Sequence, residues 1–386
     1  MYCNVTLPRH NKIGAGAIEE LGTLSSQLGI RRPVLVTDSY LNGAGQTDRL
    51  ATILRAAGCD PAVFSDTVPD PTSSSLIPGV EAVRRHKADA VIGFGGGSPI
   101  DTAKALAVLA TSERGIASFK APSFYSGPAL PIVAVPTTAG SGSEATQFTI
   151  ITDDETHEKM LCAGVSFLPL AAVIDFELTV TMPARLTADA GVDALTHAIE
   201  AYVSRRANPF SDGFALTAMR SIAVNLRRAY VDGQDRVARE AMMLASMQAG
   251  IAFSNASVAL VHGMSRPIGG HFHVAHGLSN AMLLPVVTRY SAEAAPGRYA
   301  DCARAMGLAD DATSDVVAAA ALVDELDALC DDVAVPSPAE YGINEKDWNT
   351  RLDVMAQQAL ASGSPGNNPR IPDIDEVIQL YQRMYR

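Results

Sequence analysis

The sequence is poor in the features that mark membrane, secreted or disulfide-bonded proteins. Its 386 residues include only five cysteines and one tryptophan, and only 19% of them are charged. The cysteines lie far apart, with no Cys-x-x-Cys pair, which is typical of reduced thiols in a cytosol. No apolar stretch reaches the roughly 18 to 20 residues that cross a bilayer, and the N-terminus has no apolar segment of signal-peptide length. We therefore expect a cytoplasmic protein without a membrane partner.

Positive charge is also scarce. There are 30 basic and 42 acidic residues, a net charge of −12, and no run of Lys or Arg exceeds two. Binding to nucleic acid requires a concentrated basic surface, so a nucleic-acid partner is not expected. Apolar residues make up 47% of the chain, which excludes a disordered protein, and the length favours two domains with separate cores.

Strand and helix patterns alternate through the first half of the chain. Strands are predicted at 33–37, 62–64, 88–94 and 130–135, and helices at 48–57, 78–85 and 99–110. This alternation is typical of a parallel, doubly wound sheet, whose ligands bind outside the carboxyl ends of the strands. Beyond about residue 183 strand signals nearly vanish, and a surface loop at 362–372 precedes a final helix. We expect an α/β domain at 1–182 and an all-α domain at 183–386.

A glycine-rich segment, Gly95–Ser98, lies between a predicted buried strand and a predicted helix. Glycine lets the backbone approach a phosphate, and the helix N-terminus presents free N–H groups. Ser98 stands where the dinucleotide pattern G-x-G-x-x-G has its third glycine. Asp38, at the end of another strand, is placed to accept from ribose hydroxyls, and the 137–142 loop offers further donors. These residues predict a nucleotide site, although a structural turn, a capping aspartate and an ordinary polar loop give the same pattern.

Four of the eight histidines fall within residues 262–276. Pro267 and the following glycine pair predict a break in any helix there, so His262 is expected to end one helix and His276 to begin the next. On spacing alone, His271 and His273 are alternative metal ligands to these two.

Asp193 and His197 lie four residues apart upstream, and this spacing places both on one face of a predicted helix. A carboxylate and an imidazole at that spacing, together with two more imidazoles, suit a divalent first-row cation with one position left open. The simpler interpretation of the pair is a surface or capping interaction.

Four segments, in order along the chain, resemble the iron-containing (group III) alcohol dehydrogenases. Residues 191–202, GVDALTHAIEAY, and 262–281, HGMSRPIGGHFHVAHGLSNA, are similar to the two signatures of that family. Residues 95–104, GGGSPIDTAK, and 136–144, PTTAGSGSE, are similar to its cofactor loops. The resemblance implies an N-terminal Rossmann-like domain with a parallel sheet, a C-terminal helical domain, and an active site in the cleft between them. The dehydroquinate synthases share this architecture.

The resemblance also implies site residues. The metal, Fe²⁺ or Zn²⁺, would be held by Asp193, His197, His262 and His276. NAD, favoured over NADP by the aspartate at position 38, would lie over Asp38, Asp70, Gly95, Gly96, Gly97, Ser98, Asp101, Thr137, Thr138, Ser141, Gly142 and Lys159.

This chain departs from the family where a histidine is often found four residues after the third ligand, because Arg266 stands there. Arginine stays protonated and cannot act as a general base. Arg266 and His271 are therefore the catalytic candidates: Arg266 as a contact for an anionic substrate, against the alternative of a structural salt bridge, and His271 as a proton relay, against a place on the loop surface.

The expected activity is hydride transfer between a small alcohol or aldehyde and NAD. The alternative is a lyase of the dehydroquinate-synthase type, which uses NAD and a metal but returns NAD unchanged. Such a lyase requires a cluster of basic residues for a phosphorylated substrate, and beyond Lys159 and Arg266 the sequence offers none. Family members assemble as dimers or larger oligomers, so a homo-oligomer is expected.

Overall fold

The computed structural model describes residues 3–386, which divide into two compact units. The α/β unit contains residues 6–138 and 142–181, and the helical unit contains residues 3–5, 139–141 and 182–386. The predicted fold class, a parallel α/β part followed by an all-α part, is confirmed. The short segment 139–141 belongs to the helical unit although it lies in the first half of the sequence.

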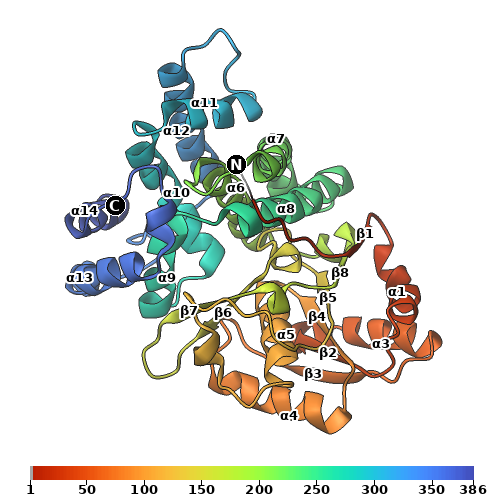
Figure 1. The fold of residues 1–386 in the computed structure, drawn as a ribbon. Coiled ribbons are helices and arrows are strands. Elements are labelled where there is room, and N and C mark those ends of the chain that lie inside the picture. Colours follow the sequence, from red (N-terminus) through yellow and green to blue (C-terminus); the bar gives the residue numbers. More distant parts are fainter. Residues whose placement is uncertain (1–2) are drawn as a thin grey trace. The chain divides into compact units, whose positions relative to one another are not determined.

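A six-stranded parallel sheet forms the centre of the α/β unit, in the order β1-β8-β5-β4-β2-β3 (Figure 1). The strands are β1 (His10–Ile13), β2 (Pro33–Asp38), β3 (Ala62–Thr67), β4 (Ala90–Gly95), β5 (Ile132–Pro136) and β8 (Ala171–Ile174). Strand β2 pairs with both β3 and β4, so the strand order reverses between β2 and β4. In such sheets the crevice at the reversal, outside the carboxyl ends of the strands, is the preferred ligand site.

Helices cover both faces of the sheet. They are α1 (Leu21–Gln27), α2 (Ser39–Gly43), α3 (Gln46–Ala56), α4 (Ile77–His86) and α5 (Gly97–Leu109). Successive strand residues point to opposite faces. Leu35 of β2 therefore packs in the core beneath α1 and α3, whereas Val34 and Val36 pack in the core beneath α4 and α5. Burial on both faces explains why the strands read as near-continuous apolar runs.

The sequence patterns did not indicate helices α1 and α2 or four strands of this unit. The strands are the edge strand β1, strand β8, and an antiparallel hairpin of β6 (Phe148–Thr152) and β7 (Lys159–Ala163). Strands β1 and β8 have only four residues each, too few for a clear period-2 pattern.

The helical unit consists of long helices with their own caps. They are α6 (Ala184–Val203), α7 (Pro209–Val231), α8 (Arg236–Ala256), α9 (Leu260–Phe272), α10 (His276–Ala292), α11 (Pro296–Ala305), α12 (Asp315–Asp332), α13 (Glu345–Ala361) and α14 (Ile374–Met384). Helix α7 begins with a capping box between Asn208 and Ser211 and has proline at its start. Helix α6 packs closely on α7 at Gly191, where an added Cβ would overlap a methyl group of Leu226.

The expected helix break at Pro267 is wrong. Helix α9 continues through Pro267, so His262 lies in its first turn rather than at its end. A proline inside a helix costs about 3 kcal/mol. Leu260, Met264 and Ile268 are completely buried on this helix, and their burial offsets that cost. His276 does begin the next helix, α10, as predicted.

Among residues 3–386, no single helix combines the length and apolarity needed to span a membrane. Helices α8 and α9 meet that test only jointly, by length and composition, and they are bent by 104°.

A buried charged group ties α5 to the segment that follows β5. The ammonium of Lys104 is completely buried and donates to the Thr146 carbonyl (3.0 Å), the Thr146 hydroxyl (2.9 Å) and the Phe148 carbonyl (2.7 Å). Asp101 accepts from the Ser143 hydroxyl (2.5 Å) and from the Ile150 N–H (2.8 Å). Burial raises the pKa of Glu144 to about 7, against the opposing effect of Lys104.

We predict that Glu144→Gln changes the pH dependence of stability. The ordinary pKa of the group is 4.5, so between that value and about 7 the folded protein binds more protons than the unfolded chain. The free energy of unfolding therefore falls as pH rises through this window. The variant lacks that loss. Between pH 4.5 and about 7, its free energy of unfolding relative to that of wild type should therefore rise by about 1 to 3 kcal/mol.

Urea titrations followed by circular dichroism measure the effect. Glu113→Gln is the control, because Glu113 is exposed and forms only a 3.4 Å surface pair with Arg84. Identical pH slopes for Glu144→Gln and wild type would show that Glu144 is not responsible.

Candidate metal centre and cofactor surface

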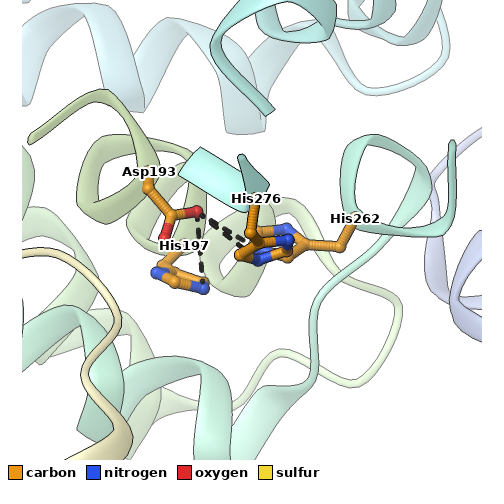
Figure 2. A group of neighbouring side chains, drawn as sticks. All are labelled: Asp193, His197, His262 and His276. Atoms are coloured by element: carbon orange, nitrogen blue, oxygen red, sulfur yellow. Dashed lines mark ion pairs between the residues drawn. The ribbon is translucent and has the colours of Figure 1, made fainter. Parts of the chain in front are cut away.

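Four potential metal ligands meet inside the helical unit (Figure 2). Asp193 and His197 project from α6, His262 from the first turn of α9, and His276 is the first residue of α10. One ligand atom from each residue lies within 4.8 Å of all the others. The chain thus brings together the four residues that the sequence resemblance assigned to a metal.

The separations suit a tetrahedral site. Asp193 Oδ1 lies 3.9 Å from His197 Nε2, 3.6 Å from His262 Nε2 and 3.9 Å from His276 Nε2. Ligand atoms bonded at 2.1 Å to one tetrahedral cation lie about 3.4 Å apart. The side chains of Asp193, His197 and His262 are only 4 to 5% exposed, whereas that of His276 is 37% exposed. Three of the four ligands are therefore buried, and solvent reaches the cluster at His276, as a site that admits a substrate requires.

The amide of Asn280, on α10, shows where the acceptor lone pairs converge. Its nitrogen donates to Asp193 Oδ1 (2.7 Å) and lies 3.0 Å from His262 Nε2 and 3.2 Å from His276 Nε2. Asn280 is completely buried, and its amide oxygen finds no hydrogen-bond partner among the described residues. An electropositive amide nitrogen thus lies within 3.2 Å of one carboxylate oxygen and two ring nitrogens, so these ligand atoms fit a cation.

The charges of the cluster are strongly coupled. Burial alone would raise the pKa of Asp193, but His197, His276 and His262 together hold it well below its usual range. Burial lowers the pKa of His197 to about 4, which keeps this imidazole neutral. Burial would likewise lower the pKa of His262, but the carboxylates of Asp193 and Glu200 raise it to about 9. Asp193 is therefore an anionic donor and His197 a neutral one, as metal ligands must be, whereas His262 would have to release a proton from Nε2 when a cation binds.

Glu200 and Asn280 are two contributors to this site that the sequence patterns did not single out. Glu200 Oε2 lies 2.7 Å from His262 Nδ1, on the side of the ring away from the cluster. The sequence spacing could have identified Glu200, because residues 193, 197 and 200 share one face of a helix. Asn280 lies four residues after His276 and so shares a face of α10 with it.

The Gly95–Ser98 segment lies at the reversal point of the sheet in the α/β unit, between β4 and α5. Gly95 has φ +147°, and an added Cβ would lie 2.6 Å from Pro99 Cγ. At Gly96 a Cβ would lie 3.3 Å from Thr138 Cγ2. A side chain at Gly95 would be strained and would crowd Pro99, so this turn requires glycine. The amides at the start of α5, from Gly97 on, are placed to bind a phosphate.

The other cofactor residues predicted in this unit fall into two groups. Asp70, Ser98 and Lys159 are linked, since Lys159 Nζ donates to Asp70 Oδ1 (2.7 Å) and the Asp70 N–H donates to the Ser98 hydroxyl (3.3 Å). Asp38 ends β2 and accepts from the Leu41 N–H (2.9 Å), which caps α2. Asp101 accepts from the Ser143 hydroxyl and the Ile150 N–H, so its carboxylate holds the segment that follows Gly142.

The remaining predicted residues have simpler surroundings. The Thr137 N–H donates to the Gly95 carbonyl (2.9 Å), which fixes the spacing of the two loops. Gly142 has φ +60°, and Ser141 belongs to the helical unit. A role for these residues in binding a cofactor remains a prediction.

The two catalytic candidates differ in position. Arg266 is half-buried and lies one turn after His262 on α9, on the same helix face. His271 lies nine residues after His262, about 13 Å farther along α9, and its Nε2 is 2.9 Å from Gln358 Oε1. His273 is exposed. Neither His271 nor His273 belongs to the ligand cluster, and the contact with Gln358 gives no support to His271 as a proton relay.

Comparison with known proteins gives matches over nearly the whole chain. The profile "Iron-containing alcohol dehydrogenase" matches residues 8–176, and "Fe-containing alcohol dehydrogenase family, C-terminal" matches residues 187–385. The NAD-dependent methanol dehydrogenase of Bacillus methanolicus is 36% identical over 378 residues, 98% of each chain. A crystal structure of 1,3-propanediol oxidoreductase superposes with a TM-score of 0.95, at 36% identity and full coverage of both chains. Sulfoacetaldehyde reductase from Bifidobacterium kashiwanohense, solved with NAD+, has a TM-score of 0.89 at 26% identity, covering 100% of this chain and 99% of that one.

We predict that Asp193→Asn lowers the affinity for Zn²⁺ by more than about 100-fold, because loss of an outer partner alone costs 10- to 100-fold. Chelator competition on purified protein measures this affinity. His273→Gln is the control, and it should bind one Zn²⁺ per chain with unchanged affinity. Loss of binding in His273→Gln together with retention in Asp193→Asn would place the metal elsewhere.

Proposed function

Because the chain belongs to the iron-containing alcohol dehydrogenase family, we propose that it transfers hydride between a small alcohol and NAD at the Asp193–His197–His262–His276 cluster. The observation that carries the proposal is the convergence of one carboxylate and three imidazoles in a chain whose two halves both match that family. The assignment of these four ligands, and the choice between Fe²⁺ and Zn²⁺, belong to the proposal.

The chemistry needs a group that stabilises negative charge on oxygen. A divalent cation held by the cluster would lower the pKa of an alcohol hydroxyl and polarise an aldehyde carbonyl. The four side chains supply the charge and geometry that hold such an ion, and burial of three of them keeps water from competing. The exposed edge of His276 marks the side from which the substrate oxygen enters.

NAD carries the hydride chemistry, and the chain's part is to bind and orient it. In the proposed site the amides at Gly95–Ser98 hold the pyrophosphate, and the carboxylate of Asp38 accepts from the adenosine ribose. Asp38 would also repel a 2′-phosphate, so NAD is preferred over NADP. Lys159, fixed by its 2.7 Å contact with Asp70, supplies a positioned cation on the same unit.

The similar proteins favour a dehydrogenase over the lyase alternative. The matched families and relatives are dehydrogenases and reductases, and a relative solved with NAD+ reduces an aldehyde. The proposed substrates are small alcohols and aldehydes. A homo-oligomeric assembly and a cytoplasmic location are also part of the proposal. The cytoplasmic location agrees with the five cysteines, which are all free thiols.

A substrate panel tests the function. Protein stripped of metal is reloaded separately with Fe²⁺ and with Zn²⁺, then supplied with NAD or NADP and short primary alcohols. We expect net formation of NADH with at least one metal, little activity without metal, and a preference for NAD. An enzyme that binds NAD and turns over without net NADH would instead be of the lyase type.

Arg266 defines a finer proposal about substrate class. It shares a helix face with the ligand His262, and a fixed guanidinium there would hold a carboxylate or sulfonate by a bidentate contact. The structural relative that reduces sulfoacetaldehyde, an anionic aldehyde, makes this chemistry relevant.

We predict that Arg266→Gln lowers kcat/KM for anionic aldehydes by about 10- to 100-fold, the effect of losing a hydrogen bond to a charged group, and changes it little for neutral ones. Steady-state kinetics on matched neutral and anionic aldehydes measure the difference. Arg220→Gln, at an exposed position of α7, is the control. An equal loss on both substrate sets would make Arg266 a structural residue.

A further inference from the structure

Three hydrogen-bond donors converge on the carboxylate of Glu200, which is only 3% exposed. Glu200 Oε1 accepts from the Val261 N–H (2.6 Å), and Oε2 accepts from the Ala259 N–H (2.9 Å). The third contact joins Oε2 to His262 Nδ1 at 2.7 Å. Glu200 lies on α6, the helix that carries Asp193 and His197, whereas its partners lie at the start of α9.

We propose that Glu200 is a positioning residue of the metal centre, which fixes His262 with its proton on Nδ1 and its Nε2 lone pair directed at the cluster. This inference rests on the proposed metal site, but it does not depend on which alcohol is oxidised or on which cofactor is used.

The acceptor character of a carboxylate determines the tautomer. Both oxygens of Glu200 already accept from backbone N–H groups, so the carboxylate is also the acceptor, and His262 Nδ1 the donor, in the 2.7 Å contact. The proton of a neutral imidazole then sits on Nδ1, and Nε2 is left with the lone pair that faces Asp193 Oδ1 at 3.6 Å. A carboxylate behind a ligating histidine also increases the basicity of the ligand nitrogen.

The same carboxylate anchors the helix that carries His262. Ala259 occupies the N-cap of α9 and has no side-chain hydrogen bond to offer, so the first amides of the helix need another acceptor. Glu200 takes two of them, and its negative charge is favourable at the positive end of the helix dipole. The side chain therefore fixes both the backbone and the ring of His262.

Charge balance agrees with this role. Asp193 and Glu200 are both buried carboxyl side chains of α6. A divalent cation at the cluster would neutralise the pair, whereas burying two carboxylates without a counter-charge is costly.

The test compares Zn²⁺ affinity by chelator competition in wild type, Glu200→Gln and Glu200→Asp. We expect Glu200→Gln to bind 10- to 100-fold more weakly, since an amide cannot accept from all three donors, and Glu200→Asp to recover part of that loss. Glu144→Gln is the matched control, because Glu144 is as deeply buried at 1% exposure but lies in the other unit. Its affinity for Zn²⁺ should equal that of wild type.

A spectroscopic readout separates positioning from general destabilisation. In Zn²⁺-saturated protein, the Nδ1 proton of His262 should give a downfield proton resonance, identified by its loss in His262→Gln. In Glu200→Gln the resonance should move upfield, because an amide oxygen is a weaker acceptor than a carboxylate. Unchanged affinity or an unmoved resonance in Glu200→Gln overturns the proposal. If this variant does not fold, Glu200→Asp decides in the same way, and wild-type affinity with an unmoved resonance is again the contrary result.

Failure of this inference is distinguishable from failure of the proposed function. Wild type that binds one Zn²⁺ but oxidises no alcohol would contradict the function and leave the role of Glu200 intact. Wild type that oxidises alcohols, with Glu200→Gln binding Zn²⁺ equally well, would contradict only the inference.

Discussion

Burial of two carboxylates next to three imidazoles is the constraint on which the helical unit depends. Asp193 and Glu200 are each 3% exposed, and neither can stay ionised there without partners of opposite charge or several donors. Glu200 meets this requirement with two backbone amides and His262, whereas Asp193 relies on the histidines and the amide of Asn280. The ligand atoms of Asp193 and the three histidines also lie within 4.8 Å of one another, an arrangement that a divalent cation would fit.

In the α/β unit, the segments proposed to bind the cofactor follow the carboxyl ends of β2 and β4, where the strand order reverses. Glycine at position 95 is required by both φ and close contact, and the buried Lys104–Asp101 group fixes the neighbouring segment from beneath. Two of the side chains predicted to bind the cofactor also have structural contacts, since Asp38 caps α2 and Asp101 holds the segment after Gly142.

Much of this architecture was predictable from sequence, for identifiable reasons. Long buried strands such as β2 and β4 have clear patterns, whereas β1, β6 and β8 are too short to show one. The four residues of the cluster were assigned through the family resemblance, because spacing alone left His271 and His273 as alternatives to His262 and His276. Glu200 was missed, because its role depends on the amides of α9, a segment that only the fold brings beside α6. The helix through Pro267 was mispredicted because local preference gave way to the burial of Leu260, Met264 and Ile268.

X-ray absorption spectroscopy of the Zn²⁺-loaded protein tests the central claim most directly. The account predicts a first shell of nitrogen and oxygen donors at about 2.0 to 2.2 Å, with the multiple-scattering signal of three imidazoles and no sulfur. A shell that contains sulfur at about 2.3 Å, or one with fewer than three imidazoles, would contradict it.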